Sequence, residues 1–214
     1  APSLTVSDGI VLFAGGEDFR PHWGSDGVLT AFDAETGKKL WEAKHPPSGY
    51  QSPEDIFVVN GVVWCGDVNH HGTPGTPNRG MTPSTGTFQG VDLQTGKVVK
   101  TIPQPEEPWN WFHHRCYRGK ATENYLLMSR TGIEMIDLAS SQWTMHHWVR
   151  GACLFGILPA NGLIYAPQHP CACYTMAKLD GFSALAADDG ADQARAATAT
   201  QPRLVKGAAY GGRP

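Results

Sequence analysis

Two stretches of the 214-residue sequence decide its fold: residues 31–41, AFDAETGKKLW, and residues 90–100, GVDLQTGKVVK. They align without gaps and share the pattern Asp-x-x-Thr-Gly-Lys. In each stretch a short apolar run ends at an aspartate, whose carboxylate can accept hydrogen bonds from N–H groups of the following turn. The glycine supplies the positive φ that a tight connection requires. We therefore expect a strand, a turn and a second strand at each place.

Weaker copies extend the pattern along the chain. Residues 135–138, MIDL, keep the strand and the aspartate, whereas residues 181–186, GFSALA, keep only the small residues. Upstream of each copy is a hairpin signal, in which Asn-Gly or Asp-Gly separates two apolar runs. These hairpin turns are assigned to positions 8, 60, 124 and 161, and the third has lost its glycine. Because the two turns recur about every 50 residues, they predict propeller blades of four strands.

Composition agrees with an all-β class. The 25 Gly, 16 Pro and seven Trp, with only 17% charged residues, favour short strands over long helices. The 17 basic and 20 acidic side chains give a formal net charge of -3, which excludes a nucleic-acid-binding protein. No apolar run approaches the roughly 18 to 20 residues that span a bilayer. Residues 1–7 are not expected to form a signal peptide.

The sequence divides into three parts. Residues 1–187 contain the four blade signals and are expected to form a partial β-propeller. Residues 188–202 are rich in Ala, Asp, Thr and Gln and are expected to be a linker, because they cannot bury a core. Residues 203–214 are expected to begin a further strand or to form a tail. Since four blades do not close a large ring, we expect the remaining blades to come from other sequence.

The pattern Ala-x-Asp-x-x-Thr-Gly-x-x-x-Trp in residues 31–41 resembles the repeat of the PQQ-binding-like β-propellers, the quinoprotein-dehydrogenase-like superfamily. Residues 90–100 match it except that Lys100 replaces the Trp. The resemblance implies four-stranded antiparallel blades, with Trp41 packed between neighbouring blades, and a periplasmic or extracellular location. PQQ itself is not an expected cofactor, because the chain has no adjacent cysteine pair and no identifiable set of calcium ligands.

Two segments interrupt the repeat and carry metal-ligating side chains. They are residues 109–118 and 169–174, which lie about one blade period apart. We therefore expect them to face each other on neighbouring blades and to offer a zinc site, since imidazole and thiolate are the usual zinc ligands. The alternative is that these cysteines pack in the core and the histidines satisfy backbone groups. The candidate ligands are His113, His114, Cys116, His169, Cys171 and Cys173.

The same region favours a second hypothesis. Arginine pairs with carboxylates, and Tyr and His can transfer protons beside them. This set is similar to that of the seven-bladed ulvan lyases, which hold zinc partly through a His-x-Cys pair such as His169 and Cys171. The last zinc-binding histidine of that family has no match, and its catalytic Tyr and Arg have no residue-by-residue counterpart. The candidate catalytic residues are His113, His114, Arg115, Tyr117, Arg118 and Arg130.

Two functions follow as expectations. The first is an exported binding or scaffold propeller with an inter-blade His/Cys site, whose partner is another protein or an acidic polysaccharide. The alternative is a polysaccharide lyase that cleaves an acidic, uronate-containing polysaccharide by β-elimination, with the arginines acting as carboxylate neutralisers or simply bracing loops. A propeller fold hosts both kinds of protein, so the sequence leaves open whether the chain is an enzyme.

Overall fold

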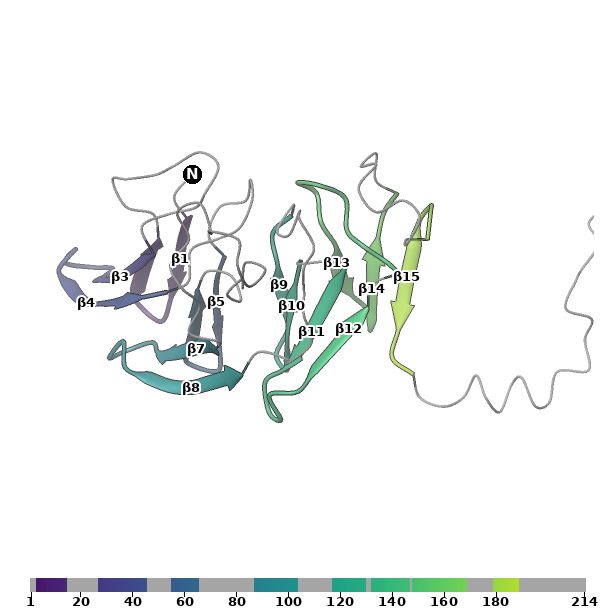
Figure 1. Ribbon diagram of the computed structural model, residues 1–214. Helices are drawn as coiled ribbons and strands as arrows, with labels where there is room; N and C mark the ends of the chain where they lie inside the picture. Colours follow the sequence, from purple (N-terminus) through teal and green to yellow (C-terminus); the bar gives the residue numbers. More distant parts are fainter. Residues whose placement is uncertain are drawn as a thin grey trace, which may run out of the picture.

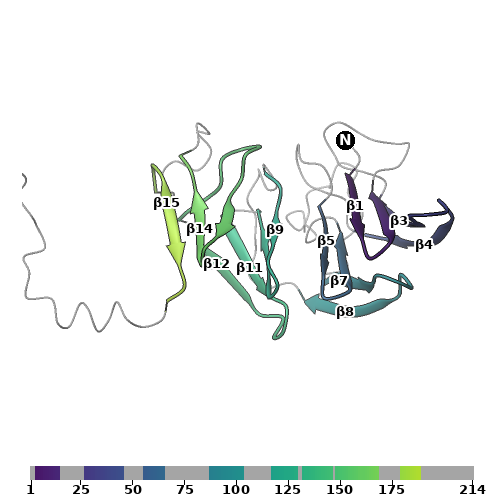
Figure 2. The same ribbon diagram turned by 180° about the vertical axis from the view of Figure 1, so that it is seen from behind.

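In the computed structural model, every regular element within the described residues is a β-strand. The described residues are 3–14, 27–45, 55–65, 87–103, 117–129, 132–146, 148–168 and 179–188. Fifteen strands form four antiparallel sheets, and in each sheet the strands follow one another in sequence order. The sheets stand side by side as blades and do not close into a ring (Figure 1, Figure 2). The prediction of an all-β, partial propeller is confirmed.

Three blades have four strands and the last has three within the described residues. Blade 1 contains β1 (Ser3–Ser7), β2 (Ile10–Ala14), β3 (Val28–Asp33) and β4 (Lys39–Lys44). Blade 2 contains β5 (Ile56–Val59), β6 (Val62–Cys65), β7 (Thr87–Asp92) and β8 (Val98–Pro103). Blade 3 contains β9 (Lys120–Ala121), β10 (Tyr125–Met128), β11 (Ile133–Asp137) and β12 (Trp143–His146). Blade 4 contains β13 (Leu158–Ala160), β14 (Leu163–Ala166) and β15 (Ser183–Ala186).

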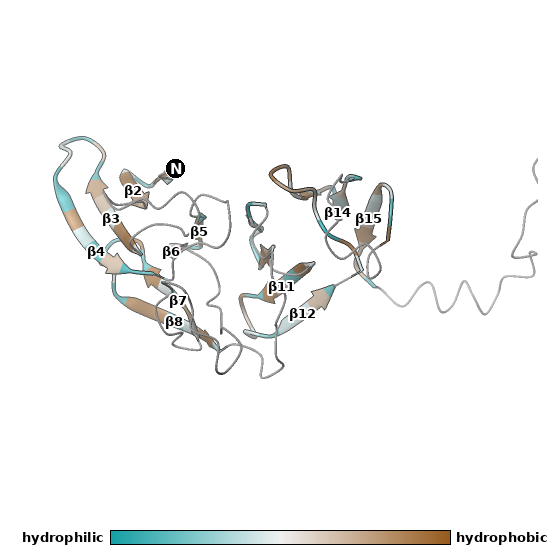
Figure 3. Cartoon of the chain, turned by 45° about the horizontal axis from the view of Figure 1, so that its top comes forward, coloured by the Kyte–Doolittle hydropathy of each residue, from teal (hydrophilic) through white to brown (hydrophobic). Residues whose placement is uncertain are grey.

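The four blades follow an open arc, with blade 1 and blade 4 at its two ends (Figure 3). The first strands lie on the inner side of the arc, because β1 contacts β5 and β5 contacts β9. There the Thr5 hydroxyl donates to the Ile56 carbonyl at 3.5 Å. The fourth strands β4, β8 and β12 are the outer edges of their sheets; β4 and β8 are mostly exposed, and β12 is mostly half-buried. This arrangement gives the molecule two different ends along the strand direction.

We call these ends the turn end and the loop end. At the turn end each blade has the hairpin between its first two strands, and blades 1 to 3 also have the Asp turn between their last two strands. At the loop end the second strand of each blade connects to the third, and each blade connects to the next. Antiparallel meanders produce this division, because every second connection returns to the same end of the sheet.

Three of the four hairpins have the expected turn. Both central residues have positive φ in the turns that begin at Asp8, Asn60 and Asn161, each followed by glycine. In blade 3, however, Tyr125 pairs with Asp137 as Ile10 pairs with Asp33, so Asn124 occupies the glycine position. The assignment of Asn124 to the first turn position was therefore wrong by one residue.

A threonine explains why the blade 3 turn has no glycine. The Thr122 hydroxyl accepts hydrogen bonds from the backbone N–H groups of Asn124, at 3.4 Å, and Tyr125, at 3.0 Å. The Thr122 N–H donates to the Tyr125 carbonyl at 2.8 Å. Asn124 is absent from the described non-glycine residues that have positive φ. A side-chain turn of this kind replaces the backbone conformation for which glycine is otherwise preferred.

The Asp turns have the predicted geometry in blades 1 to 3. In the first two blades the aspartate Oδ1 accepts from the threonine three residues later, from its N–H at 2.7 and 2.8 Å and its hydroxyl at 2.6 and 2.7 Å. Gly37 and Gly96 then adopt φ of 69° and 68°. In blade 3 the Asp137 Oδ1 accepts from the Ser140 N–H at 2.7 Å, and Ser141 takes the glycine position with a φ of 61°.

These hydrogen bonds favour the charged form of the aspartates. The threonine hydroxyl is the main reason that the pKa of Asp33 and of Asp92 lies below its ordinary value of 3.8. The backbone N–H of Ser140 is the main reason that the pKa of Asp137 is also lowered. All three turns therefore contain an aspartate that is ionised at neutral pH.

Apolar side chains are buried between successive blades, so the core forms three layers. The layer between blades 1 and 2 contains Ile10, Leu12, Ala14, Leu29, Ala31, Ile56, Val63, Cys65, Val91 and Leu93. The layer between blades 2 and 3 contains Val59, Trp64, Phe88, Ile102, Leu126, Met128 and Ile136. The layer between blades 3 and 4 contains Tyr117, Leu127, Ile133, Val149, Ile157 and Ala166. We call the sheet face toward the next blade the forward face and the opposite one the back face.

Side-chain hydrogen bonds also join the blades at their outer strands. The Trp41 Nε1 donates to the Leu93 carbonyl of blade 2 at 2.9 Å, so this tryptophan does pack between blades. Lys100 occupies the same place in blade 2, and its Nζ donates to the Leu138 carbonyl of blade 3. The substitution that breaks the sequence pattern therefore keeps the inter-blade hydrogen bond.

The described strands extend from residue 3 to residue 186, within the predicted propeller part. The predicted linker, apart from Asp188, and the predicted strand or tail at 203–214 lie outside the described residues. Within the described ranges there is no helix with the length and apolar character needed to cross a bilayer.

Candidate functional site at the loop end

The metal-ligating residue types follow the strand order in the sequence. Each of the nine histidines and five cysteines is either near the loop end of a described strand or in a stretch of sequence that joins two such ends. The turn end has instead the aspartates of the Asp turns. Of the histidines and cysteines, the structure describes His45 directly after β4, Cys65 and His146 at the loop ends of β6 and β12, and Cys153 in the connection between β12 and β13.

Most of the predicted site falls outside the described part of the chain. This holds for all six candidate zinc ligands and for two of the three candidate arginines. Within the described residues, no group of three or more His, Cys, Asp or Glu side chains could hold a metal ion. The zinc site therefore stays a prediction. The undescribed candidates are His113, His114, Arg115, Cys116, Arg130, His169, Cys171 and Cys173.

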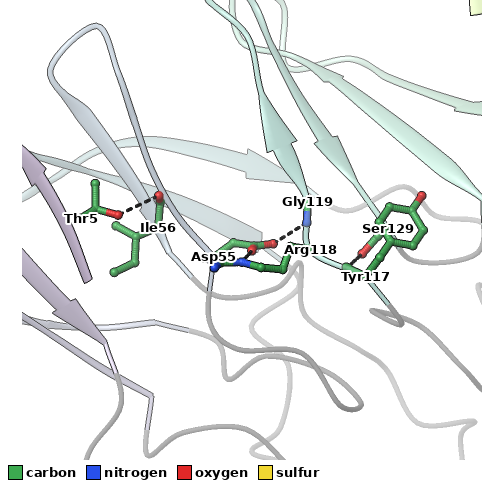
Figure 4. Close-up of polar contacts among 7 residues, drawn as sticks. All are labelled: Thr5, Asp55, Ile56, Tyr117, Arg118, Gly119 and Ser129. Carbon is green, nitrogen blue, oxygen red and sulfur yellow. Dashed lines mark hydrogen bonds and ion pairs between the residues drawn. The ribbon is translucent and has the colours of Figure 1, made fainter. Parts of the chain in front are cut away.

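Tyr117 is a described candidate, and it lies in the core between blades 3 and 4. Its side chain is fully buried, and its hydroxyl donates to the Gly132 carbonyl at 2.6 Å. Its own carbonyl accepts from the Ser129 hydroxyl at 2.5 Å (Figure 4). A Cβ at Gly156 would lie 3.1 Å from the tyrosine ring, so the ring fits closely against the chain that leads into blade 4. These contacts anchor the start of blade 3.

Arg118 is the other described candidate, and a buried carboxylate holds it. The Asp55 side chain is 1% exposed, and its Oδ1 lies 3.1 Å from the Arg118 Nε. The Asp55 Oδ2 accepts from the Gly119 N–H at 2.7 Å (Figure 4). Asp55 precedes β5 and Arg118 precedes β9, so one carboxylate joins the loop ends of blades 2 and 3 on the inner side of the arc.

This ion pair leaves part of the arginine in contact with solvent, since the Arg118 side chain is 50% exposed. A buried acceptor on Nε orients the planar guanidinium and reduces the conformational entropy that binding would cost. The arrangement can present a fixed cation to an anionic group at the loop end. Asp55 was not predicted as a site residue, because its partner is 63 positions away and no local pattern marks the pair.

Two further charged side chains are buried at the loop end and were also missed. Glu134 is 0% exposed, and its Oε1 accepts from the Gly132 N–H at 3.3 Å. Arg150 is 3% exposed and lies in the connection between blades 3 and 4. Charged groups are costly to bury and concentrate at functional sites and structural networks. Neither residue was singled out in the sequence, because no local pattern marks a charged residue as buried.

An aromatic residue is exposed close to these groups in sequence. Trp148 is 62% exposed, and its carbonyl accepts from the Leu179 N–H at 2.8 Å. This hydrogen bond ties the connection after β12 to the one before β15 at the loop end. An exposed indole offers a flat face on which sugar rings or apolar groups can stack. The described part of the loop end thus combines an oriented cation, buried charges and an exposed aromatic ring.

No protein-family model matches the chain, and no curated protein matches it significantly. Among solved structures, the computationally designed Ika4 protein is 12% identical, with a TM-score of 0.50 over 86% of this chain and 88% of that one. BamB from Moraxella catarrhalis is 16% identical, with a TM-score of 0.44 over 76% of this chain and 42% of BamB. A variant of KlHsv2 with loop 6CD replaced by a Gly-Ser linker is 6% identical, with a TM-score of 0.39 over 73% of this chain and 40% of that one.

These likenesses concern the fold alone. The chain spans about two fifths of the length of BamB and of the KlHsv2 variant, but most of the designed protein. At such low identity no residue of the loop end is assigned a role by comparison, so its function must be argued from its own chemistry.

Proposed function

We propose that the chain is a segment of a PQQ-binding-like β-propeller that works as an exported binding or scaffold domain, with its ligand surface at the loop end. The observation that supports this is the combination, in the described part of that end, of the oriented Arg118 cation, the buried Glu134 and Arg150 and the exposed Trp148. Functional groups concentrate on loops that a rigid scaffold positions. The partner is another protein or an acidic polysaccharide, and further blades complete the ring.

Within this surface we propose a zinc site formed by the two His/Cys segments. One segment leads into Tyr117 and β9, and the other follows β14, so a shared metal ion would join blade 3 to blade 4. Imidazole and thiolate donors suit zinc, which takes four of them in a closed structural site. The proposed ligands are four of the six residues His113, His114, Cys116, His169, Cys171 and Cys173.

The test is the metal content of the purified 214-residue chain, measured by elemental mass spectrometry. We expect about one zinc per chain, lost in both His169→Ala and Cys171→Ala. His45→Ala is the matched control, because His45 follows β4 in blade 1 and belongs to neither segment. A folded wild-type chain that contains no metal, or a zinc content that survives both substitutions, would overturn the site.

The second candidate is a polysaccharide lyase, and the Asp55–Arg118 pair favours it. In β-elimination at a uronate, a base removes the proton on C5 and its electron pair forms the C4=C5 double bond. The bond from C4 to the bridging oxygen then breaks, and an acid protonates that oxygen. An oriented cation beside the uronate carboxylate stabilises the negative charge that develops there. Arg118 has the exposure and the fixed orientation for this role.

Activity on acidic polysaccharides tests this alternative through the ultraviolet absorbance of the unsaturated product. We expect Arg118→Gln to lower kcat/KM by about 100-fold or more, and Asp55→Asn to lower it less. Lys97→Gln is the control, because Lys97 is an exposed cation at the turn end. His113→Ala and His114→Ala would locate the proton-transfer group. Absence of product from every uronate polymer tried would leave the binding domain as the better account.

A further inference from the structure

The three core layers are built from one repeating pair of sheet faces. In the second strand of every blade, the first and third residues lie on the forward face and the second and fourth on the back face. This follows from the register of Ile10, Val62, Tyr125 and Leu163 against the third strand. Each layer is a forward face packed on the back face of the next blade.

Burial in the matched positions is nearly complete. On forward faces, Leu12, Trp64 and Leu127 are at most 2% exposed. On back faces, Val63, Cys65, Leu126, Met128 and Ala166 are at most 3% exposed, whereas Ile164 is partly buried. Most positions of both kinds of face are thus buried where a neighbouring blade is present, although Val62 and Ile164 are only partly buried and Tyr125 is 41% exposed.

Within the described residues, no blade lies against the back face of blade 1. Leu4 and Val6 are 64% and 60% exposed, and they pair with Phe13 and Val11 on the same face of the sheet. Val11 and Phe13 are only partly buried, although they occupy the positions of Val63 and Cys65 in blade 2. This face resembles the buried back faces in composition, because its residues on the first three strands are apolar or threonine.

Likewise, no blade within the described residues lies against the forward face of blade 4. Leu158 is 59% exposed and pairs with Tyr165, which is partly buried although it occupies the position of Leu12 and Trp64. The Tyr165 ring lies 6.1 Å from the ring of Phe182, which is 68% exposed. No charged side chain belongs to β13, β14 or β15. An apolar face of this kind is a docking surface.

We propose that a second copy of this chain covers both faces, with the forward face of blade 4 in one copy packed on the back face of blade 1 in the other. Each of the three layers within the chain packs the forward face of one blade on the back face of the next. The two uncovered faces are one back face, in blade 1, and one forward face, in blade 4, so they could pack on each other in the same way. Head-to-tail contacts close into a ring when the rotation between copies allows it. Two copies would give eight blades, within the range of propellers.

The test is the mass of the 214-residue chain in solution, by size-exclusion chromatography with light scattering. We expect twice the 23.1 kDa of one chain. Leu4→Glu and Leu158→Glu should each raise the dimer dissociation constant by roughly 100-fold or more, because each buries an unpaired charge in both contacts of the ring. Val99→Glu is the control, since Val99 is 56% exposed on the outer strand β8 and belongs to neither end face.

The pattern of results separates this dimer from other assemblies. If both end-face substitutions give folded monomers and the control stays dimeric, the head-to-tail contact is supported. If only one of them dissociates the dimer, the copies meet through identical faces and the proposal is wrong. A folded wild-type monomer would also overturn it, and would indicate that blades of other sequence cover these faces. Open filaments would contradict the closed ring. None of these outcomes depends on the zinc site or on lyase activity.

Discussion

The junction between blades 1 and 2 and the junction between blades 2 and 3 each use a main-chain carbonyl at an equivalent position as the hydrogen-bond acceptor. The side chains that donate to it differ. At the first junction the Trp41 indole donates to the Leu93 carbonyl, and its ring lies directly over Gly96. A Cβ built on Gly96 would be only 2.7 Å from two atoms of that ring. The large donor therefore requires a residue without a side chain beneath it.

The second junction has the opposite combination. Ser141 takes the place of Gly96 and keeps its left-handed backbone, so a Cβ occupies the space that an indole would need. Lys100 replaces the tryptophan there, and its Nζ donates to the Leu138 carbonyl. Trp143 adds a hydrogen bond in the reverse direction, to the Pro103 carbonyl at 2.9 Å. We infer that the two departures from the repeat, Ser141 in place of glycine and Lys100 in place of tryptophan, depend on each other, because the side chain at one position limits the space for the other.

The largest expected effect comes from filling the space under Trp41. We expect Gly96→Ala to lower the free energy of unfolding by about 2 to 3 kcal/mol, because it adds a clash with the ring to the strain of a left-handed alanine. Urea denaturation would measure it. Gly37→Ala is a matched control, since Gly37 has nearly the same φ and nothing within 4 Å of its Cβ, and should cost only about 1 kcal/mol. Equal losses in the two variants would show that the ring contact is unimportant.

Rebuilding the first junction in the place of the second tests the coupling directly. Lys100→Trp alone should destabilise the protein by about 2 kcal/mol, because the indole meets the Ser141 side chain. Ser141→Gly in the same chain should recover most of that loss. A double-mutant cycle should then give a coupling energy of about 1 kcal/mol or more. Strictly additive effects would contradict the spatial argument.

Removing only the donor at the second junction should have a smaller effect. Lys100→Met keeps the length of the side chain and removes the ammonium group that bonds the Leu138 carbonyl. We expect a loss of about 1 kcal/mol, the usual net contribution of such a hydrogen bond. Lys97→Met, at an exposed position in the preceding turn, should change stability by less than about 0.5 kcal/mol. Thermal denaturation of both variants side by side would distinguish them.

Acid should loosen both junctions slightly, because Leu93 and Leu138 directly follow Asp92 and Asp137. The folded protein lowers the pKa of these aspartates below 3.8, through the Thr95 hydroxyl for Asp92 and chiefly through backbone N–H donors for Asp137. Their contribution is therefore fully present above the ordinary pKa and is lost as the pH falls through the lowered one. Urea midpoints should decline below about pH 4, and less steeply in Asp92→Asn.

The fold was predictable because its signals are local. Asp33, Thr36 and Gly37 make their turn almost without help from the rest of the chain, so the pattern alone revealed strands, turns and period. The blade 3 hairpin was misplaced by one residue because Thr122 supplies a turn that needs no glycine. A side-chain hydrogen bond can thus stabilise a hairpin turn that lacks the glycine by which such turns are recognised in a sequence.

The candidate site was less predictable, because its contacts join distant parts of the chain. Asp55 meets Gly119 across 64 positions, and nothing in the residues around it marks a partner. Tyr117 was selected for its hydroxyl, which the structure uses to anchor a core layer. Lys100 was taken as a break in the repeat, whereas its amine makes the inter-blade hydrogen bond in place of the indole. Sequence patterns identified which residue types are unusual, but not which atoms they meet.

The acceptors at both junctions are main-chain carbonyls, and this has a consequence for how the blades can diverge. Every residue type carries a carbonyl, so substitution at Leu93 or Leu138 cannot delete the acceptor. Only the donor side can be lost by mutation, and it has been exchanged rather than deleted in passing from Trp41 to Lys100. Mutations can therefore change only the donor of each inter-blade hydrogen bond. The acceptor belongs to the main chain and is present whichever side chain the residue carries.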